Sequence, residues 1–537
     1  MKILKGNIVD IVNKRIFKGE IHFTKIIHKI VEKDVTENVF ILPGFVNSHV
    51  HIESSMLSPY AFSKSVLKHG TVAVVSDPHE IANVCGIEGI QFMIDNAKET
   101  PLKIFYTVPS CVPATTFETS GATIDSSTVK SLLSKKYFVA LSEMMNFPGV
   151  IFNDVEVHKK LTYAKQYNKP VDGHAPKLSR ENLIKYINAG ISTDHECSTL
   201  EEAIEKIKLG MKIQIREGSA AKNFDSLSSL IDLFPDNVML CTDDSHPDDL
   251  LEGHINTLVK RAFKNNLNYF NVLKASSLNA VKHYNLPVGL LQLNDPADFI
   301  ICNNQHADII LDTYINGQSI STYKFQDSVN YKYINKWNEP SLTLSDLEIP
   351  KASYYRVIEC IDGELLTNEL ILKYEDIFDF TGQLKLGFDK IVVINRYVIE
   401  KPSLGIIKNI NLKNGAFGST IAHDSHNILI AGHDDLSILS VFNKLSENMG
   451  GLATSNGEFT LSLPLPIGGL MTNDDVFVVA TKYKELQSFV NSFLGSTLKA
   501  PFMTLSFMAL LVIPEIKIGD KGLFKINDLS FVPLVYS

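Results

Sequence analysis

Two histidines separated by a single residue, His49 and His51, are the first side chains of the sequence whose spacing suits metal chemistry. Successive side chains of a β-strand point to opposite faces, so both imidazoles would leave the same face and could bind one cation. An HxH motif arises readily by chance in a chain with 16 histidines, so the spacing alone carries little weight. Its meaning depends on where the other candidate ligands lie.

Further histidines and carboxylates stand where short apolar runs of the sequence end. They are Asp77, His79, Glu143, His174, His195 and Asp243. If the runs are parallel strands of a barrel, their carboxyl ends converge on one mouth, where such enzymes keep their active sites. A ligand set of imidazoles and carboxylates without thiolates suits Zn, Mn or Fe(II) and does not select among them. These residues predict a metal-dependent hydrolase, and we consider a set of unrelated exposed polar residues the weaker explanation.

Eight apolar runs, most of them separated by amphipathic stretches, would position these side chains. The runs are 44–49, 71–76, 104–109, 138–143, 170–174, 190–195, 212–217 and 238–243. Alternation of strands with crossover helices predicts an α/β fold with a parallel sheet, and the number of runs favours a closed (β/α)8 TIM-like barrel over an open sheet. We place this catalytic domain at residues 44–284.

Shorter stretches of alternating polarity flank the predicted barrel. They occur in residues 1–43 and again in 285–325, where Asn316-Gly317 is a hairpin turn signal. We expect these two segments to pair into a small β-sandwich domain. A further α+β domain is predicted over residues 340–537, with a strand at 390–394 and a helix at 435–445.

Composition limits the classes of partner. With 537 residues the chain exceeds the size of a single core, and 45% hydrophobic with 21% charged residues is typical of soluble globular proteins. A net charge of -9 argues against nonspecific binding to nucleic acid or anionic membranes. We see no secretory signal and no apolar stretch long enough to span a bilayer. Six cysteines without a CxxC pair argue against a disulfide framework, so we expect a cytoplasmic protein acting on a small molecule.

Several long sequence blocks resemble a known family. The segment LPGFVNSHVHIESSMLSP is similar to the first-strand signature of the amidohydrolase superfamily. The blocks DPHEIANVCGIEGI, SEMMNFPGV, VDGHAP, GISTDHECSTLEEA and CTDDSHPDDL resemble the bacterial adenine deaminases within it. With AHDSHNI and GGLMTNDD in the second half, the resemblance covers nearly the whole chain.

The resemblance implies a binuclear metal centre that hydrolyses adenine to hypoxanthine and ammonia in purine salvage. Two divalent ions are implied, Mn2+ first, with Fe2+ and Zn2+ as alternatives, and we expect a homodimer. Carried over by position, one ion would be held by His49, His51 and Asp243 and the other by His174 and His195. Glu143 would bridge the two ions, because no lysine stands in this strand to form the carboxylated bridge found in many amidohydrolases.

Deamination of adenine also requires proton transfers. A hydroxide held by two cations would attack C6, and carboxylates would move protons to the ring and to the leaving nitrogen. Asp244 and Asp77 are the candidates for this role. His79, Glu80 and Arg216 are candidates for contact with the purine. The alternative for Asp244, Asp77, His79 and Glu80 is that each orients a metal ligand. Arg216 could instead pair with Glu217.

A second group of histidines in the C-terminal half has no assigned role. The spacing of His423 and His426 makes a separate metal site conceivable, but no complementary ligands at strand ends accompany them. We favour a loop that closes over the barrel mouth, and we leave the role of His433 open.

Two other functions compete with adenine deamination. A hydrolase of cyclic amides would share the metal ligands and differ in the pocket. A metal-binding or purine-sensing protein without activity would need a broken ligand set, and none of the ligands is missing. The small zinc deaminases are excluded, because the sequence has no P-C-x-x-C element.

Overall fold

The computed structural model describes residues 1–219, 221–326 and 333–536. Their Cα positions divide into two compact units. Unit 1 comprises the described parts of Met1–His79, Met93–Cys111 and Ile124–Asn330, and unit 2 comprises those of Glu80–Phe92, Val112–Thr123 and Tyr331–Ser537. The domain boundaries expected from the sequence, 1–43 with 285–325, 44–284, and 340–537, stay a prediction.

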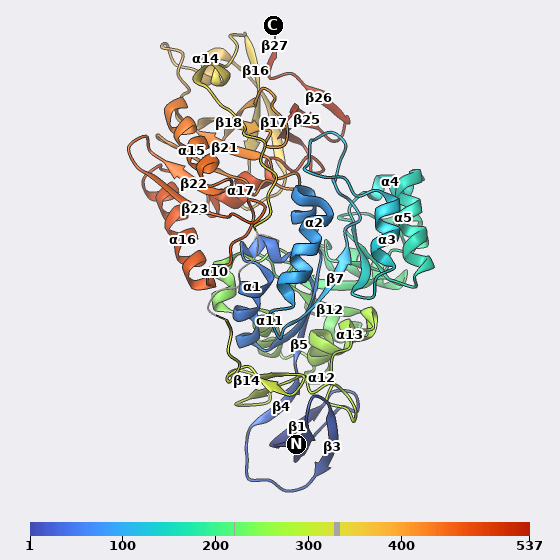
Figure 1. Ribbon diagram of the computed structural model, residues 1–537. Helices are drawn as coiled ribbons and strands as arrows, with labels where there is room; N and C mark the ends of the chain where they lie inside the picture. The colour runs from blue at the N-terminus through green and yellow to red at the C-terminus, as the bar shows by residue number, and fades with distance from the viewer. Residues whose placement is uncertain (220, 327–332, 537) are drawn as a thin grey trace. The chain divides into compact units, whose positions relative to one another are not determined.

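Within the described part of the chain, eight parallel strands form the centre of unit 1 (Figure 1). They are β5 (Phe45–Val50), β6 (Thr71–Ser76), β7 (Lys103–Val108), β8 (Phe138–Met144), β9 (Val171–Gly173), β10 (Thr193–Asp194), β11 (Lys212–Arg216) and β12 (Val238–Cys241). The sheets β5 to β9 and β10 to β12 are joined by the parallel bridges Val171 to Ile191 and Val50 to Asp243. The strands therefore close into a barrel in chain order, and the predicted (β/α)8 fold is confirmed.

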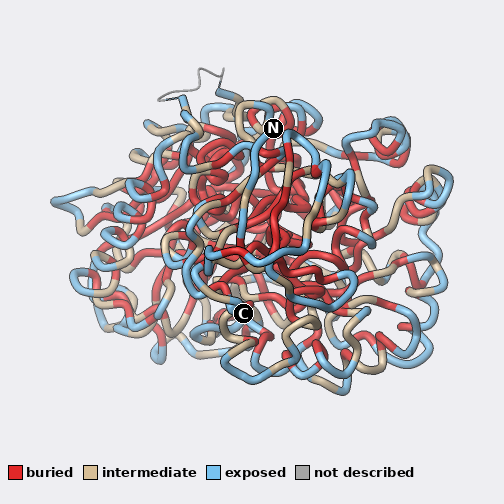
Figure 2. The backbone as a smooth tube through the Cα atoms, turned by 90° about the horizontal axis from the view of Figure 1, so that it is seen from below, coloured by how far each residue is buried: buried red, intermediate tan, exposed pale blue. Residues whose placement is uncertain are grey.

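Most residues of the barrel strands are buried, which is why the strands are apolar runs in the sequence. Every residue of β5 and β6 is buried, and buried backbone is drawn in red in Figure 2. The core of this region gathers apolar side chains from the strands and from the helices between them, such as Ile213, Leu240 and Leu258.

Helices follow the strands where the sequence provides caps and an apolar face. Ser58 caps α1 (Pro59–Val66), and Thr199 caps α7 (Leu200–Lys208), through side-chain oxygens that accept backbone N–H groups. The other helices of unit 1 are α3 (Ser126–Leu133), α4 (Phe147–Ile151), α5 (Val155–Gln166), α6 (Arg180–Asn188), α8 (Phe224–Leu227), α9 (Leu230–Leu233), α10 (Pro247–Glu252), α11 (Ile255–Lys264), α12 (Tyr269–Leu273) and α13 (Asn279–Tyr284). The helix α2 (His79–Ala97) follows β6, and its segment Glu80–Phe92 is counted with unit 2. A π-helical turn at Lys274–Leu278 joins α12 to α13.

The N-terminal strands and those after the barrel form one mixed sheet of unit 1. Its order is β15-β14-β13-β4-β1-β2-β3. The bounds are β1 (Lys2–Asp10), β2 (Arg15–Phe23), β3 (Ile27–Glu32), β4 (Phe40–Pro43), β13 (Phe299–Cys302), β14 (Ile310–Ile315) and β15 (Gln318–Ser319). β4 pairs antiparallel with β13, which confirms the expected pairing of the two segments. Asn316 and Gly317 have φ values of 47° and 71° and form the two-residue turn between β14 and β15.

Unit 2 is an α+β unit, as predicted. Its larger sheet has the order β17-β16-β19-β18-β21-β20-β22-β23, with β27 on β16, and a smaller sheet has the order β24-β25-β26. The strands are β16 (Tyr354–Cys360), β17 (Thr367–Lys373), β18 (Phe388–Ile394), β19 (Ser403–Lys408), β20 (Ala416–Ser419), β21 (Ile428–Gly432), β22 (Gly451–Ser455), β23 (Thr460–Pro464), β24 (Ile516–Gly519), β25 (Gly522–Lys525), β26 (Ser530–Val532) and β27 (Val535–Tyr536). The helices are α14 (Tyr374–Ile377), α15 (Asp435–Glu447), α16 (Val476–Ser492) and α17 (Pro501–Phe507).

Among the described residues, no helix has both the length and the apolar character that a membrane span needs.

Candidate active site

The carboxyl ends of the barrel strands bring the predicted ligands of unit 1 together. His49 lies in β5 and His51 directly after it, Asp77 and His79 follow β6, and Glu143 lies near the end of β8. The remaining three follow β9, β10 and β12 and are His174, His195 and Asp243. All are buried except His174, which is partly exposed. Residues up to 194 positions apart therefore meet because the barrel closes on itself.

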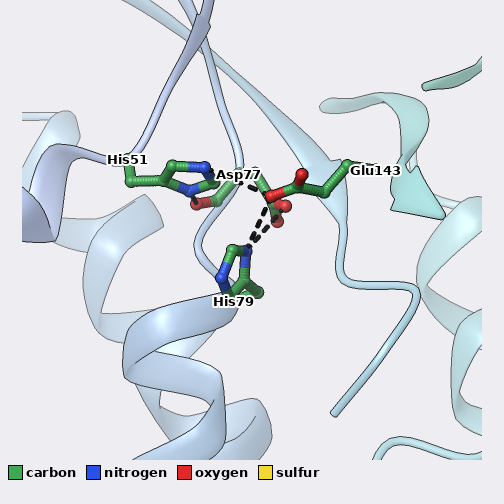
Figure 3. A group of neighbouring side chains, drawn as sticks. All are labelled: His51, Asp77, His79 and Glu143. Carbon is green, nitrogen blue, oxygen red and sulfur yellow. Dashed lines mark hydrogen bonds and ion pairs between the residues drawn. The ribbon is translucent and has the colours of Figure 1, made fainter. Parts of the chain in front are cut away.

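Figure 3 shows one part of this cluster, in which His51 contacts Glu143 and His79 contacts both Asp77 and Glu143. His79 Nδ1 lies 2.9 Å from Asp77 Oδ2 and 3.6 Å from Glu143 Oε1. His51 Nε2 lies 3.3 Å from the same Glu143 oxygen, and the His51 Nδ1 faces the Asp77 carbonyl at 3.2 Å. The ligand atoms of these four residues all lie within 4.8 Å of one another, so they could hold one ion.

Glu143 lies between two groups of histidines. While its Oε1 faces His51, its Oε2 lies 2.8 Å from His174 Nδ1 and 3.2 Å from His195 Nε2. Burial would raise the pKa of this carboxyl, but the hydrogen bonds with His174, His195 and His51 outweigh it and hold the pKa well below the usual value. An anionic carboxylate with one oxygen turned to each group has the geometry of a bridging ligand.

Asp243 lies beside His49 and His51. Its Oδ1 lies 3.2 Å from His51 Nε2 and 3.5 Å from His49 Nε2. The His49 ring stacks on that of His195 with centroids 4.3 Å apart, and its buried Nε2 makes no hydrogen bond. Burial and the neighbouring His195 lower the pKa of His49, so the ring is neutral with a nitrogen available to a metal.

Arg216 and Glu196 form a buried ion-pair network beside Asp243. Arg216 Nη2 lies 3.0 Å from Glu196 Oε2 and Nη1 lies 2.5 Å from Asp243 Oδ2, while Nη1 also pairs with Glu196 Oε1. Burial would raise the pKa of Glu196, but Arg216 lowers it far below the usual value. Arg216 does not pair with Glu217, which instead contacts Arg261 at 2.6 Å.

Sequence reasoning did not name Glu196. Its Oε1 lies 3.3 Å from His195 Nε2 and 3.5 Å from His174 Nδ1. The available signal was its position directly after His195 at the end of a predicted strand.

The two predicted proton carriers have different surroundings. Asp244 accepts a hydrogen bond of 2.5 Å from Ser54 Oγ, and its carboxylate belongs to a group with His51 and Asp243. Asp77 pairs with His79 as described above. Glu80 belongs to unit 2, where its carboxylate contacts His423 and His426. The C-terminal histidines thus have a carboxylate partner that their sequence neighbourhood did not reveal.

The donors fit divalent ions that accept nitrogen and oxygen ligands. The cluster contains three overlapping sets of side chains whose ligand atoms are close enough to hold one ion. They are His49 with His195 and Asp243; Glu143 with His174 and His195; and His51 with Asp77, His79 and Glu143. Imidazole and carboxylate ligands without thiolates match Zn, Mn and Fe(II).

Comparison with known proteins identifies the family. Residues 40–320 match the model of the amidohydrolase family, and residues 364–530 match the adenine deaminase C-terminal domain. Adenine deaminases from Methanosarcina barkeri and Borreliella burgdorferi are 48% and 45% identical to this chain, covering 99% and 98% of it and 99% of each relative. The chain belongs to the adenine deaminase family. The resemblance found in the sequence blocks is confirmed, and the adenine deaminase C-terminal domain lies within unit 2.

Proposed function

We propose that this chain is an adenine aminohydrolase that converts adenine and water to hypoxanthine and ammonia with two divalent metal ions. Membership of the adenine deaminase family supports the substrate. The observation that supports the metal pair is the division of the Glu143 carboxylate, with Oε1 turned to His51 and Oε2 to His174 and His195.

We assign one ion to His49, His51 and Asp243 and the other to His174 and His195, with Glu143 between them. When bound, such ions supply a nucleophile near neutral pH by lowering the pKa of water, and they stabilise negative charge on the substrate. Asp243 is kept anionic in this scheme, because Arg216, His49 and His51 together outweigh the effect of burial on its pKa.

The remaining residues of the cluster act on protons and orientation. Asp244 is held by Ser54, so one carboxylate oxygen is fixed while the other can carry a proton toward the leaving amine. The Asp77 and His79 pair can relay a proton to the purine ring, because the imidazole can pass it from one nitrogen to the other. Arg216 contacts Glu196 and Asp243 through its Nη atoms, which favours a role in holding Asp243 over direct contact with adenine.

Manganese is the ion we propose first, with iron(II) and zinc as alternatives, since the donor set accepts all three. We also propose that the protein is a cytoplasmic homodimer that serves purine salvage. The absence of a CxxC pair among six cysteines supports a reducing compartment.

The test is ammonia release from adenine by protein that has been stripped of metal and reconstituted with Mn2+, Fe2+ or Zn2+. We expect activity that saturates near two ions per chain. Ring opening of hydantoin or dihydropyrimidine releases no ammonia, so it is followed separately by detection of the N-carbamoyl product, and little of that product is expected. Glu201→Gln, which removes an exposed carboxylate on α7, serves as a control that keeps activity. No ammonia with any of the three ions would overturn the proposal.

A further inference from the structure

A fully buried ion pair in unit 1 contacts the segments that carry two of the predicted metal ligands. It joins Lys206 of α7 to Asp194 of β10, and both side chains are 0% exposed. Lys206 Nζ lies 3.0 Å from Asp194 Oδ2 and also donates to the Ala175 carbonyl at 2.7 Å and to Glu202 Oε1 at 2.9 Å. An ammonium group has three donors, so all of them are used. Apolar residues of similar size are often at least as stable as a buried ion pair, so stability alone does not explain this arrangement.

The Asp194 carboxylate joins the segments of two histidines. Asp194 directly precedes His195, and its Oδ2 accepts the N–H of Glu196, the residue after that histidine, at 3.1 Å. Its Oδ1 accepts the N–H of Ala175, the residue after His174, at 2.9 Å. Because the lysine binds the carbonyl of the same alanine, both backbone polar groups beside His174 are held.

The His195 ring has no hydrogen bond on its second nitrogen that would orient it. Within the described part of the chain, no donor or acceptor pairs with its buried Nδ1. Histidines that bind metals usually donate this second ring N–H to a carboxylate or a carbonyl, and the contact fixes the ring. For His195, the position of its backbone and the stacking of its ring on His49 have to set the orientation instead.

Carboxylates of α7 hold the same two segments at further points. Between β9 and α6, Lys177 and Arg180 have φ values of 60° and 55°, a left-handed conformation that residues with a Cβ atom rarely adopt. Their N–H groups donate to Glu202 Oε1 at 2.8 Å and to Glu205 Oε1 at 2.9 Å. Between β10 and α7, the N–H of Ser198 donates to Glu202 Oε2 at 3.2 Å. Strained backbone persists only where the surroundings enforce it, and here α7 does so.

We propose that Lys206, Asp194 and Glu202 are positioning residues, which fix the segments that carry His174 and His195 and thereby set the affinity for the metal ion assigned to these two histidines. This inference rests on the proposed function and deepens it, because it names what holds one ion of the pair. That ion has two histidine ligands besides the bridging carboxylate, whereas the other ion has three ligands of its own. Its affinity therefore depends more on where each ligand is held.

Two substitutions with matched controls test the proposal. Glu202→Ala removes the acceptors at the partly exposed end of the arrangement, and Glu201→Ala removes an exposed carboxylate from the same first turn of α7, so both change the charge near the helix dipole equally. Lys206→Met keeps the length of the side chain and removes the buried charge. Its control is Lys274→Met, because Lys274 is also a buried lysine of unit 1 and pairs with Asp236 at 2.5 Å, near the amino end of β12.

The experiment measures the binding of Mn2+ to metal-free protein by competition with a chelating dye, and elemental analysis counts the bound ions. Electron paramagnetic resonance distinguishes two Mn2+ ions coupled through a shared carboxylate from an isolated ion. We expect both test variants to keep one ion with unchanged affinity and to bind the other about 10- to 100-fold more weakly, as for loss of a residue that supports a metal ligand. At Mn2+ concentrations that just saturate the parent protein, the coupled spectrum should give way to that of an isolated ion. Both controls should match the parent.

Several results would overturn the inference. Test variants that fold, as judged by circular dichroism, and still bind two coupled ions tightly would show that the arrangement serves stability alone. Equal weakening of both ions, or as large a loss of metal in Lys274→Met as in Lys206→Met, would show a general disturbance. If Lys206→Met does not fold, Glu202→Ala against Glu201→Ala decides. A parent protein that binds a coupled pair but releases no ammonia from adenine would contradict the proposed function and leave this comparison intact.

Discussion

Replacement of Arg216 by methionine should destabilise the barrel strongly, because it leaves two buried carboxylates without their cation. Arg216 is 8% exposed and contacts both Glu196 and Asp243. Breaking a buried ion pair by removing one partner costs about 3–5 kcal/mol. We therefore expect the free energy of unfolding of metal-free protein at pH 7 to fall by about this amount, measured by urea titration followed by circular dichroism.

Arg261 offers a matched control, because it too contacts two carboxylates, those of Glu217 and Asp225, but its side chain is 35% exposed. Arg261→Met should cost only about 0–1 kcal/mol, as is usual for pairs at the surface.

The loss in unfolding free energy caused by Arg216→Met should also depend on pH. Glu196 has a folded pKa far below its unfolded value, so its contribution is present above about pH 4.3 and is lost as the pH falls. The gap in unfolding free energy between the parent protein and Arg216→Met should therefore stay nearly constant from pH 7 to about pH 5 and narrow below about pH 4.3. Equal losses for the two arginine variants, or a gap that widens in acid, would refute the reasoning.

Three further predictions follow from other features. Glu143→Gln keeps the shape of the side chain but removes its charge. Bound metal, measured by elemental analysis, should fall from about two ions per chain to one or fewer, and turnover in the ammonia assay should fall about 100-fold. Unchanged metal content would contradict the bridging role. Burial lowers the pKa of His254 to about 3, so below about pH 6.5 its imidazole is protonated in the unfolded chain but not in the folded one. The free energy of unfolding should therefore fall by about 2 kcal/mol between pH 7 and pH 5 because of this histidine. His254→Asn keeps a donor toward Thr71 and should remove that part of the pH dependence in urea titrations; an unchanged slope would refute the assignment. Gly317→Ala would place a Cβ atom 1.6 Å from the Thr24 carbonyl oxygen at a residue with φ of 71°, so the melting temperature should drop by several degrees, and a neutral effect would contradict the close approach.

The barrel and the gathering of its ligands could be predicted from the sequence for a physical reason. Parallel strands buried on both faces are continuous apolar runs, and all eight runs correspond to observed strands. Closure of a barrel places the carboxyl end of every strand at one mouth, so His49, Glu143 and Asp243 could be grouped without knowledge of side-chain positions.

The pairings within the cluster could not be predicted in the same way. The contact of Arg216 with Glu196 and Asp243 depends on how side chains turn after β10, β11 and β12, which the strand pattern does not specify. Glu80 and His426 are 346 positions apart and belong to no repeated pattern, so no local signal connects them. The π-helical turn at Lys274–Leu278, between α12 and α13, likewise has no signal in the apolar pattern of the sequence.

The pairing of β4 with β13 also bears on how the chain is made. Phe40 lies opposite Cys302, so the strand that completes this edge of β4 leaves the ribosome about 260 residues later. At about 5–20 residues per second, the interval is roughly 13–50 s. During that time β4 has an unpaired edge, and such edges can join the strands of neighbouring chains. The order of synthesis therefore exposes the first segment of this protein to aggregation until the barrel has been translated, and chaperones that bind nascent chains would act there first.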